Sequence, residues 1–216
     1  MIDKLPDGSP SAALAELLRE VAVMPVITIS DAALAVPLAE ALLAGGIGAI
    51  EVTLRTKAAL PAIEAIARQV PQMLIGAGTI LSPDDGRRAS AAGSRFLVSP
   101  GLTATLAKAD LGSPLLPGVA TASEAMQARE WGFHFLKLFP AESVGGLSLL
   151  KSWSGPLQDL VFCPTGGVDP VKARAYLTQK NVICVGGSWI ASEAAIEGRD
   201  WRGITERARE TTTLRG

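Results

Sequence analysis

The chain has 216 residues, of which 48% are hydrophobic and 19% are charged, and its formal net charge is −1. This composition is typical of a soluble globular protein with a sizeable core, in one large domain or two small ones. The nearly neutral charge gives no reason to expect nucleic acid or an anionic membrane as a partner. No apolar run approaches the roughly 20 residues that span a bilayer. Residues 1–10 also lack the apolar core of a secretory signal, so we expect a cytoplasmic protein.

Strands and helices alternate along the whole chain after a leading helix, which is predicted over residues 11–21 with Ser11 as its cap. Helical patterns follow the predicted strands, and the last amphipathic one begins at residue 200 and ends near residue 210. Strand starts recur roughly every 18–26 residues, close to the size of a minimal βα unit. The predicted strands cover residues 23–29, 49–54, 73–80, 96–99, 114–119, 135–139, 161–163 and 182–185.

Eight βα units in unbroken alternation predict an α/β protein, a single (β/α)8 TIM barrel with an extra N-terminal helix. The domain is expected to span residues 1–216, with residues 1–9 flexible. A doubly wound open sheet is the competing architecture. The barrel is favoured because the strand count fits and no Gly-rich dinucleotide fingerprint follows the first strand. No composition shift or Pro/Ser-rich linker indicates a second domain.

Metal and disulfide chemistry find little support in the sequence. Cys163 and Cys184 both lie in apolar, strand-like runs, which predicts buried free thiols rather than a disulfide framework. The single histidine, His134, has no cysteine or acidic pair beside it, so a zinc centre is not expected. We therefore predict no metal site, and we interpret His134 as a structural or surface residue.

One lysine stands out in the run Phe135–Pro140 (FLKLFP), which contains the sixth predicted strand. Side chains alternate between the two faces of a strand, so Lys137 shares its face with Phe135 and Phe139. Removing an ammonium group from water favours the neutral amine, which is a nucleophile toward ketones. The alternative is a lysine on an edge strand, with its stem along apolar surface and its head in water.

The second predicted strand alternates between an apolar and a polar face. Ile50, Val52 and Leu54 lie on one face, and Glu51, Thr53 and Arg55 lie on the other. A surface edge strand would alternate in the same way, but a closed barrel has no edges. Polar groups buried inside a barrel are costly unless they are paired or used. Glu51 is thus a candidate acid/base and Arg55 a candidate clamp for a substrate carboxylate.

Glycine-rich turns end most of the other strands. Residues 76–79 (GAGT) allow close backbone approach and place the Thr79 hydroxyl at the mouth, although a tight barrel corner would use the same glycines. Residues 164–167 (PTGG) and 186–188 (GGS) end the seventh and eighth strands. A single Gly-Gly pair is usually a turn. Two pairs after these two strands indicate a phosphate site of backbone N–H groups and hydroxyls.

Taken together, the motifs closely resemble the 2-keto-3-deoxy-6-phosphogluconate (KDPG) aldolase family, class I aldolases of the Entner–Doudoroff pathway. Some members of that family also cleave 4-hydroxy-2-oxoglutarate (KHG). The similarity runs from about Val23 to about Trp201. The motifs occur in order at residues 51–56 (EVTLRT), 76–79 (GAGT), 99–101 (SPG), 135–142 (FLKLFPAE), 162–167 (FCPTGG) and 186–189 (GGSW).

The resemblance implies a role for each motif residue. Lys137 would form a Schiff base with the C2 ketone, and Glu51 would shuttle protons during carbinolamine formation and C3–C4 cleavage. Arg55 and Thr79 would hold the pyruvyl carboxylate. Pro100 and Phe139 would line the pocket. The far end, including the 6-phosphate, would be held by Thr165, Gly166, Gly167, Gly187 and Ser188.

The resemblance also bears on ligands and assembly. It implies a phosphorylated 2-keto-3-deoxy sugar acid and pyruvate as ligands, no metal or organic cofactor, and a homotrimer. The loop after the first strand, residues 30–32 (SDA), lacks the basic residue that some relatives carry there. Two other hypotheses stay open. One is a phosphate-binding isomerase or synthase without a covalent intermediate, and the other is a non-catalytic sensor of phosphorylated sugar acids.

Overall fold

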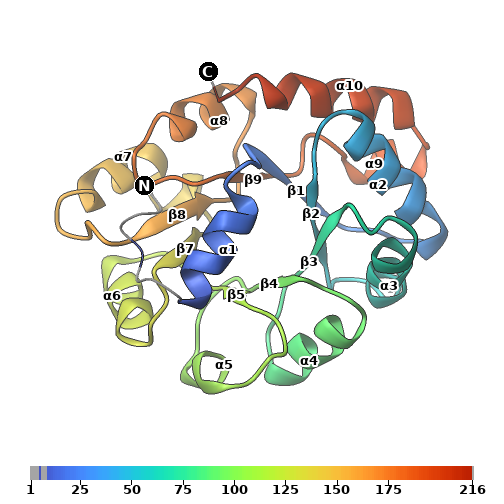
Figure 1. The fold of residues 1–216 in the computed structure, drawn as a ribbon. Helices are drawn as coiled ribbons and strands as arrows, with labels where there is room; N and C mark the ends of the chain where they lie inside the picture. The colour runs from blue at the N-terminus through green and yellow to red at the C-terminus, as the bar shows by residue number, and fades with distance from the viewer. Residues whose placement is uncertain (1–4, 6–8, 216) are drawn as a thin grey trace.

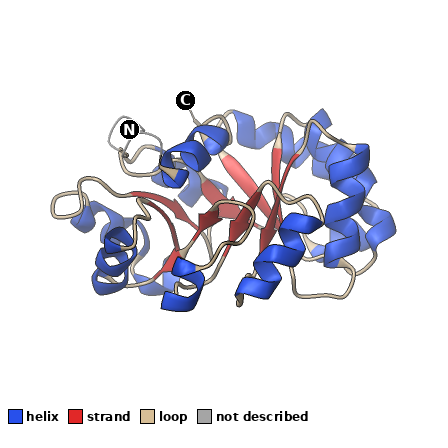
Figure 2. Cartoon of the chain, turned by 60° about the horizontal axis from the view of Figure 1, so that its bottom comes forward, coloured by secondary structure: helices blue, strands red, loops and turns tan. Residues whose placement is uncertain are grey.

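The computed structural model of the chain describes residue 5 and residues 9–215. Short parallel strands surround a central space, and helices cover their outer side (Figures 1 and 2). The strands are β1 (Val23–Ile27), β2 (Ala49–Thr53), β3 (Leu74–Gly78), β4 (Phe96–Val98), β5 (Leu115–Leu116), β6 (Gly118–Val119), β7 (Phe135–Leu138), β8 (Val161–Pro164) and β9 (Val185–Gly187). The helices are α1 (Pro10–Leu18), α2 (Ala35–Ala44), α3 (Ala59–Gln69), α4 (Pro83–Ala91), α5 (Ala104–Lys108), α6 (Ala122–Glu130), α7 (Gly146–Trp153), α8 (Pro170–Leu177), α9 (Glu193–Glu197) and α10 (Trp201–Thr212), with 3-10 turns η2 (Ala32–Leu34) and η3 (Glu142–Val144).

The strands form two curled parallel sheets, with orders β5-β4-β3-β2-β1-β9 and β6-β7-β8. Two isolated parallel bridges, Phe162 to Val182 and Thr165 to Gly186, link the β8 side to the chain around β9. The fold is therefore an α/β fold with parallel strands curled as in a TIM barrel.

Most predicted strands differ from those observed by one or two residues at their ends, and two differ more. The strand predicted over residues 114–119 is divided into β5 and β6 at Pro117, because proline has no N–H group to donate to a ladder. The strand predicted over residues 182–185 starts later, at Val185, where pairing with β1 begins. Residues 182–184 lie before that ladder and contribute only the bridge of Val182.

Helix starts follow the side chains available for capping. Ser82 with Asp85 and Thr121 with Glu124 form capping boxes at α4 and α6. For α1 the predicted cap is wrong. Ser9, not Ser11, caps the helix and accepts a hydrogen bond from the Ala12 N–H at 3.1 Å. Ser11 lies inside the helix and accepts a hydrogen bond from the His134 N–H at 3.0 Å.

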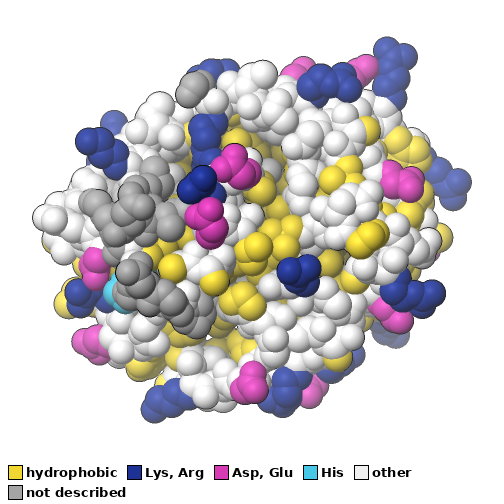
Figure 3. Space-filling model, viewed as in Figure 1, with side chains coloured by type: hydrophobic (Ala, Val, Ile, Leu, Met, Phe, Trp, Pro, Cys, Tyr) yellow, Lys and Arg dark blue, Asp and Glu magenta, His cyan; other side chains and the backbone are white. Residues whose placement is uncertain are grey.

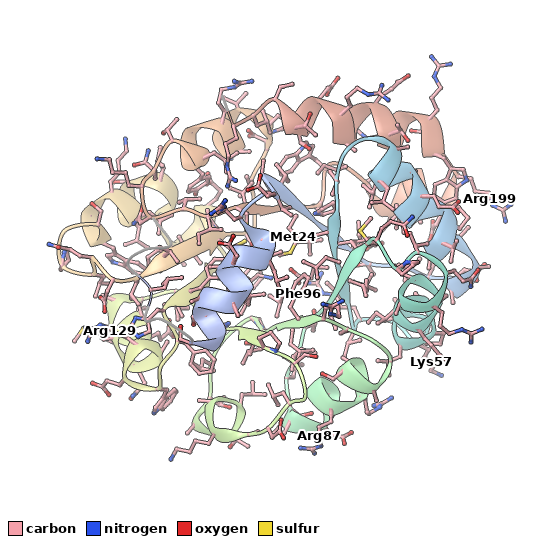
Figure 4. All side chains as sticks on the ribbon, in the orientation of Figure 1. Met24, Lys57, Arg87, Phe96, Arg129 and Arg199 are labelled. Atoms are coloured by element: carbon pink, nitrogen blue, oxygen red, sulfur yellow. The ribbon has the colours of Figure 1, made fainter. Side chains whose placement is uncertain are left out.

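Helix α1 covers the end of the sheets at which the strands begin. It contacts β5 and β7 and lies across the ring of strands in Figure 1. Its Leu14 and Leu18 belong to an apolar cluster with Met24 and Phe96, whose labelled side chains lie near the centre of Figure 4. Leu5 joins this cluster and is only 4% exposed. The remaining residues of the segment expected to be flexible, apart from the cap Ser9, lie outside the described residues.

A second apolar layer lies between the strands and the outer helices. Ile50 and Val52 point into it, while hydrophobic residues of α2 and α3 supply the other side. Charged side chains gather mostly around the rim of the face shown in Figure 3. None of the described helices is long and apolar enough to cross a membrane. The apolar layer lies on the outer side of the strands. The polar side chains of β2 and β7 lie on the opposite, inner side of the curled sheets.

Candidate active site

Lys137 lies in the middle of the interior, on β7. Gly118 of β6 and Cys163 of β8 flank it in the ladders, so β7 is an inner strand of its sheet. The Lys137 side chain is 7% exposed, and its Nζ atom lies 3.3 Å from Glu51 Oε1. Nζ also lies 5.3 Å from the centroid of the Phe139 ring. The edge-strand alternative for Lys137 is therefore wrong, because the amine is buried and paired with a carboxylate.

Glu51 reaches Lys137 from β2, on the other sheet. The residue is 1% exposed, and its Oε2 atom has no hydrogen-bond partner among the described residues. A Cβ atom at Gly78 would overlap Glu51 Oε1, so the glycine of β3 makes room for the carboxylate. A buried carboxylate oxygen without a partner costs free energy, which a ligand or a water molecule would offset. One oxygen thus holds the lysine, and the other remains available for proton transfer.

Thr53 and Arg55 continue the polar face of β2 in different ways. The Thr53 hydroxyl donates to the Ile27 carbonyl at 2.9 Å and lies 3.2 Å from the Thr28 hydroxyl, so it ties β2 to β1. The prediction that Arg55 is buried is wrong. Strand β2 ends at Thr53, and the Arg55 side chain is exposed at the mouth. Its Nε atom donates to the Thr79 hydroxyl at 3.3 Å. The two residues predicted to hold a carboxylate therefore lie together.

Thr79 has an unusual backbone conformation. Its φ angle is 63°, in the left-handed region that β-branched residues rarely adopt. The strain is consistent with a position fixed by function, since it directs the Thr79 hydroxyl to Arg55.

A cavity of about 260 Å³ opens at the carboxyl ends of β7, β8 and β9. Of the predicted site residues, it is lined by Arg55, Phe139, Thr165, Gly166, Gly167, Gly187 and Ser188. Lys137, Glu51, Thr79 and Pro100 do not line it. Phe139 connects the cavity to the amine, because its ring lies against Lys137 Nζ. Pro100 lies against Gly118, where a Cβ atom would overlap the Pro100 carbonyl group, and Gly118 pairs with Lys137.

The glycines at the far end of the cavity serve two different needs. Gly166 and Gly167 have φ angles of 102° and 75°, which L residues with side chains rarely adopt. Gly187 has an ordinary φ angle, but a Cβ atom there would overlap the ring of Trp189. Gly166 and Gly167 therefore give the loop its shape, whereas Gly187 lets the indole of Trp189 pack against the strand end.

The predicted site residues leave out several residues that line the cavity. Ser192 and Glu193 line the cavity, as do Thr28 and Ala191. Ser192 caps α9 by accepting a hydrogen bond from the Ala195 N–H at 3.3 Å. The available signal was a serine three residues after the GGSW motif, because it caps a helix that starts at the same mouth. Among the described residues that line the cavity, Arg55 is the only cation and Glu193 the only anion.

The remaining candidates of the sequence stand apart from this site. Cys163 and Cys184 are buried free thiols, and the neighbouring Cys163 together with burial raises the pKa of Cys184 well above its usual value. His134 lies near Asp159, 3.5 Å from Nδ1 to Oδ2, at the strand beginnings. Within the described part of the chain, no group of three or more His, Cys, Asp or Glu residues could hold a metal ion.

Comparisons with known proteins identify the family. The family model described as "Aldolase: KDPG and KHG aldolase" matches residues 14–207. The chain belongs to the KDPG and KHG aldolase family. It is 47% identical to the 2-dehydro-3-deoxy-phosphogluconate aldolase of Pseudoalteromonas atlantica, over 87% of this chain and 88% of that one. It is 46% identical to the KHG/KDPG aldolase of Escherichia coli, over 87% and 89% of the two chains.

A solved structure of the family agrees with this assignment. The KDPG aldolase of Legionella pneumophila, with pyruvate captured as a covalent carbinolamine intermediate, matches with a TM-score of 0.88 and 43% identity, covering 95% of this chain and 99% of that one. The family resemblance that the motifs indicate is thus confirmed, and the protein is an aldolase by family.

Proposed function

We propose that this chain is a class I aldolase that cleaves KDPG to pyruvate and glyceraldehyde 3-phosphate through a Schiff base on Lys137. The observation that carries the proposal is the buried pair of Lys137 Nζ and Glu51 Oε1, 3.3 Å apart, with Glu51 Oε2 unpartnered. A buried amine next to a carboxylate can act as a nucleophile and hand its protons to a base within reach.

The near end of the site, which is the part around Lys137 and Glu51, would perform the covalent steps. The Lys137 amine adds to the C2 ketone, and loss of water from the carbinolamine leaves a protonated imine. Glu51, directly or through a water molecule, takes the proton of the C4 hydroxyl. The C3–C4 bond then breaks, and its electron pair moves into the imine to give an enamine, while C4 leaves as the aldehyde. Protonation at C3 and hydrolysis return pyruvate and the free amine.

The two ends of the substrate would be held by different chemistry. Arg55 and Thr79, in contact at 3.3 Å, would hold the pyruvyl carboxylate. The far end would be held by Thr165, Gly166, Gly167, Gly187 and Ser188, which offer hydroxyls and backbone N–H groups. Pro100 and Phe139 would shape the space beside the lysine.

The direct test is product release from KDPG, with pyruvate followed by lactate dehydrogenase and the aldehyde by glyceraldehyde 3-phosphate dehydrogenase. The proposal predicts one molecule of each product per molecule of KDPG consumed. Conversion of KDPG without pyruvate would favour an isomerase or synthase, and binding without turnover would favour a sensor.

KHG is a second candidate substrate, because KHG/KDPG aldolases are among the relatives. KHG has the same C2 ketone and C4 hydroxyl, so the near end would cleave it to pyruvate and glyoxylate without using a phosphate contact. Its cleavage can be followed in the same pyruvate assay. No pyruvate from KHG, with KDPG turned over, would exclude it.

We also propose a closed eight-stranded barrel in one domain, in which β5 and β6 are two parts of one strand and the bridges near Gly186 close the ring. The parallel order of both sheets supports this proposal. By the family resemblance we propose a cytoplasmic homotrimer. Sedimentation velocity would measure its mass, and a monomer at micromolar concentration would contradict it.

A further inference from the structure

A cluster of charged and hydrogen-bonding side chains lies behind the Thr165–Gly167 loop, outside the cavity. Glu142 is at its centre. Its Oε1 atom accepts a hydrogen bond from the Tyr176 hydroxyl at 2.5 Å, and its Oε2 atom lies 3.2 Å from Lys172 Nζ. Asp169, the cap of α8, lies 3.6 Å from the same Nζ. The reaction proposed above assigns no role to these residues.

Three successive carbonyl groups of the loop are held, two by backbone N–H groups of residues 141 and 142 and one by the side chain of Lys172. The Ala141 N–H donates to the Thr165 carbonyl at 2.8 Å, and the Glu142 N–H donates to the Gly166 carbonyl at 3.2 Å. Lys172 Nζ donates to the Gly167 carbonyl at 3.0 Å. Each carbonyl of the loop is therefore anchored on the side of Glu142.

Anchored carbonyls determine where the loop's N–H groups point. In a trans peptide the C=O and the following N–H point in opposite directions. The N–H groups of Gly166, Gly167 and Val168 therefore point away from the Glu142 side. Among the described residues they donate to no protein acceptor, and all three residues line the cavity. The backbone of residues 141–142, together with Lys172, which is paired with Glu142, thus aims a row of free donors toward the far end of the cavity.

The space around Glu142 is fitted to its side chain. A Cβ atom at Gly167 would lie 2.9 Å from Glu142 Cβ and Cγ, and one at Gly146 would lie 3.1 Å from Glu142 Oε1. Hydrogen bonding to Glu142 raises the pKa of Lys172 above its usual value, so the amine stays charged at neutral pH. Burial raises the pKa of Tyr176, so its hydroxyl remains a donor. Lys172 is occupied by Glu142, Asp169 and the Gly167 carbonyl, and serves the loop rather than the ligand.

We propose that Glu142 is a positioning residue, which sets the affinity of the far end for a phosphate group by fixing the Thr165–Gly167 loop through Tyr176 and Lys172. The proposal rests on the proposed function for the identity of the substrate. The two can be tested separately, because the reaction of pyruvate with Lys137 at the near end is expected not to depend on Glu142.

The experiment compares Glu142→Ala, Glu142→Gln and Lys172→Met with the full-length enzyme. Glu206→Gln is the matched control, because it also removes a carboxylate from an ion pair, with Arg202 on α10, far from the loop. Four quantities are measured for each protein. They are kcat and KM for KDPG, the Kd of inorganic phosphate by phosphorus NMR titration, and the rate of proton exchange at C3 of pyruvate.

We expect Glu142→Ala to raise the KM for KDPG and the Kd of inorganic phosphate by about 10- to 100-fold, as small displacements of positioning groups do. Pyruvate exchange should stay within about twofold of the wild-type rate, since only the far end changes. Glu142→Gln and Lys172→Met should show smaller shifts in the same direction, because each keeps part of the network. These two variants decide the matter if Glu142→Ala does not fold.

Unchanged phosphate binding in the folded variants, or no phosphate binding by the wild type, would overturn the proposal. So would an equal loss of pyruvate exchange and KDPG affinity, which would indicate general damage. A wild-type protein that binds phosphate but releases no pyruvate would contradict the proposed function alone, because the phosphate Kd is measured without turnover.

Discussion

The two ends of the strands differ sharply in what their inward side chains do. On β7, Phe135 lies in the apolar cluster under α1, whereas Lys137, two residues further on, is paired with Glu51. On β2, Ala49 lies in the same cluster, and Glu51 follows it by two residues. Two residues of strand correspond to roughly 6.6 Å. Within that distance the interior changes from the apolar cluster under α1, called the floor below, to the charge pair of Lys137 and Glu51.

This difference assigns stability to one end and chemistry to the other. The floor excludes water from below, which strengthens the interaction between Lys137 and Glu51 above it. A buried ion pair adds little net stability, because desolvation offsets its attraction. The pair is therefore better explained by reactivity than by folding, whereas the apolar floor is explained by folding. Substitutions at the two ends should separate activity from stability.

The largest effect is expected for Lys137→Arg, which keeps the charge beside Glu51 but removes the nucleophilic amine. Pyruvate release from KDPG should fall by at least about a thousandfold, since a guanidinium forms no Schiff base. Circular dichroism should show a folded protein. Lys151→Arg, on the exposed side of α7, is the control and should retain activity. A folded Lys137→Arg enzyme with wild-type turnover would refute the covalent mechanism.

Glu51→Gln should reduce kcat by about a hundred- to ten-thousandfold, because the site loses its proton-transfer group. Borohydride should still trap pyruvate on Lys137, but more slowly. Stopped-flow and steady-state pyruvate assays measure the two steps separately. Glu64→Gln, an exposed carboxylate of α3, serves as control. Full turnover of Glu51→Gln would transfer the role of base to another group.

Leu14→Ala should act at the other end and lower the free energy of unfolding by about 2–5 kcal/mol, through loss of contacts in the floor. The kcat of the folded enzyme should not change. Urea denaturation and the pyruvate assay measure the two quantities. Leu17→Ala is the matched control, because Leu17 is 43% exposed on the same helix and should matter little. A lower kcat at unchanged stability would show that the two ends are not separate.

The smallest effect is expected for Glu193→Gln. Removing this exposed carboxylate from the cavity should lower the KM for KDPG by about two- to fivefold at low salt, because like charges repel. The gain should shrink as salt rises. Glu210→Gln on α10, outside the cavity, is the control. A higher KM for Glu193→Gln would show that the carboxylate assists binding, for example by accepting a substrate hydroxyl.

Strand alternation predicted Glu51 on the inward face and placed Lys137 on one face with two phenylalanines, but it left the edge-strand alternative for Lys137 open. The family resemblance then assigned the two residues their roles. The glycine pairs were also recognisable, since they follow particular strands. Such features depend on residues close in sequence.

Other features depend on contacts that no local pattern encodes. Arg55 was predicted on the inward face, but β2 ends two residues earlier and leaves the guanidinium exposed. The role of Glu142 follows from Tyr176 and Lys172, which are more than twenty residues away. The cap of α1 is Ser9, whereas the Ser11 hydroxyl accepts a hydrogen bond from the His134 N–H. In each case tertiary packing decided between locally equivalent choices.

The most direct test of the central claim is borohydride reduction in the presence of pyruvate, followed by peptide mass mapping. If Lys137 forms the Schiff base, a reduced pyruvyl adduct will be found on Lys137 and on no other lysine, and it will be absent in Lys137→Arg. A folded protein with no adduct on Lys137 would contradict the covalent mechanism and favour an isomerase or synthase that uses the lysine only as a charge.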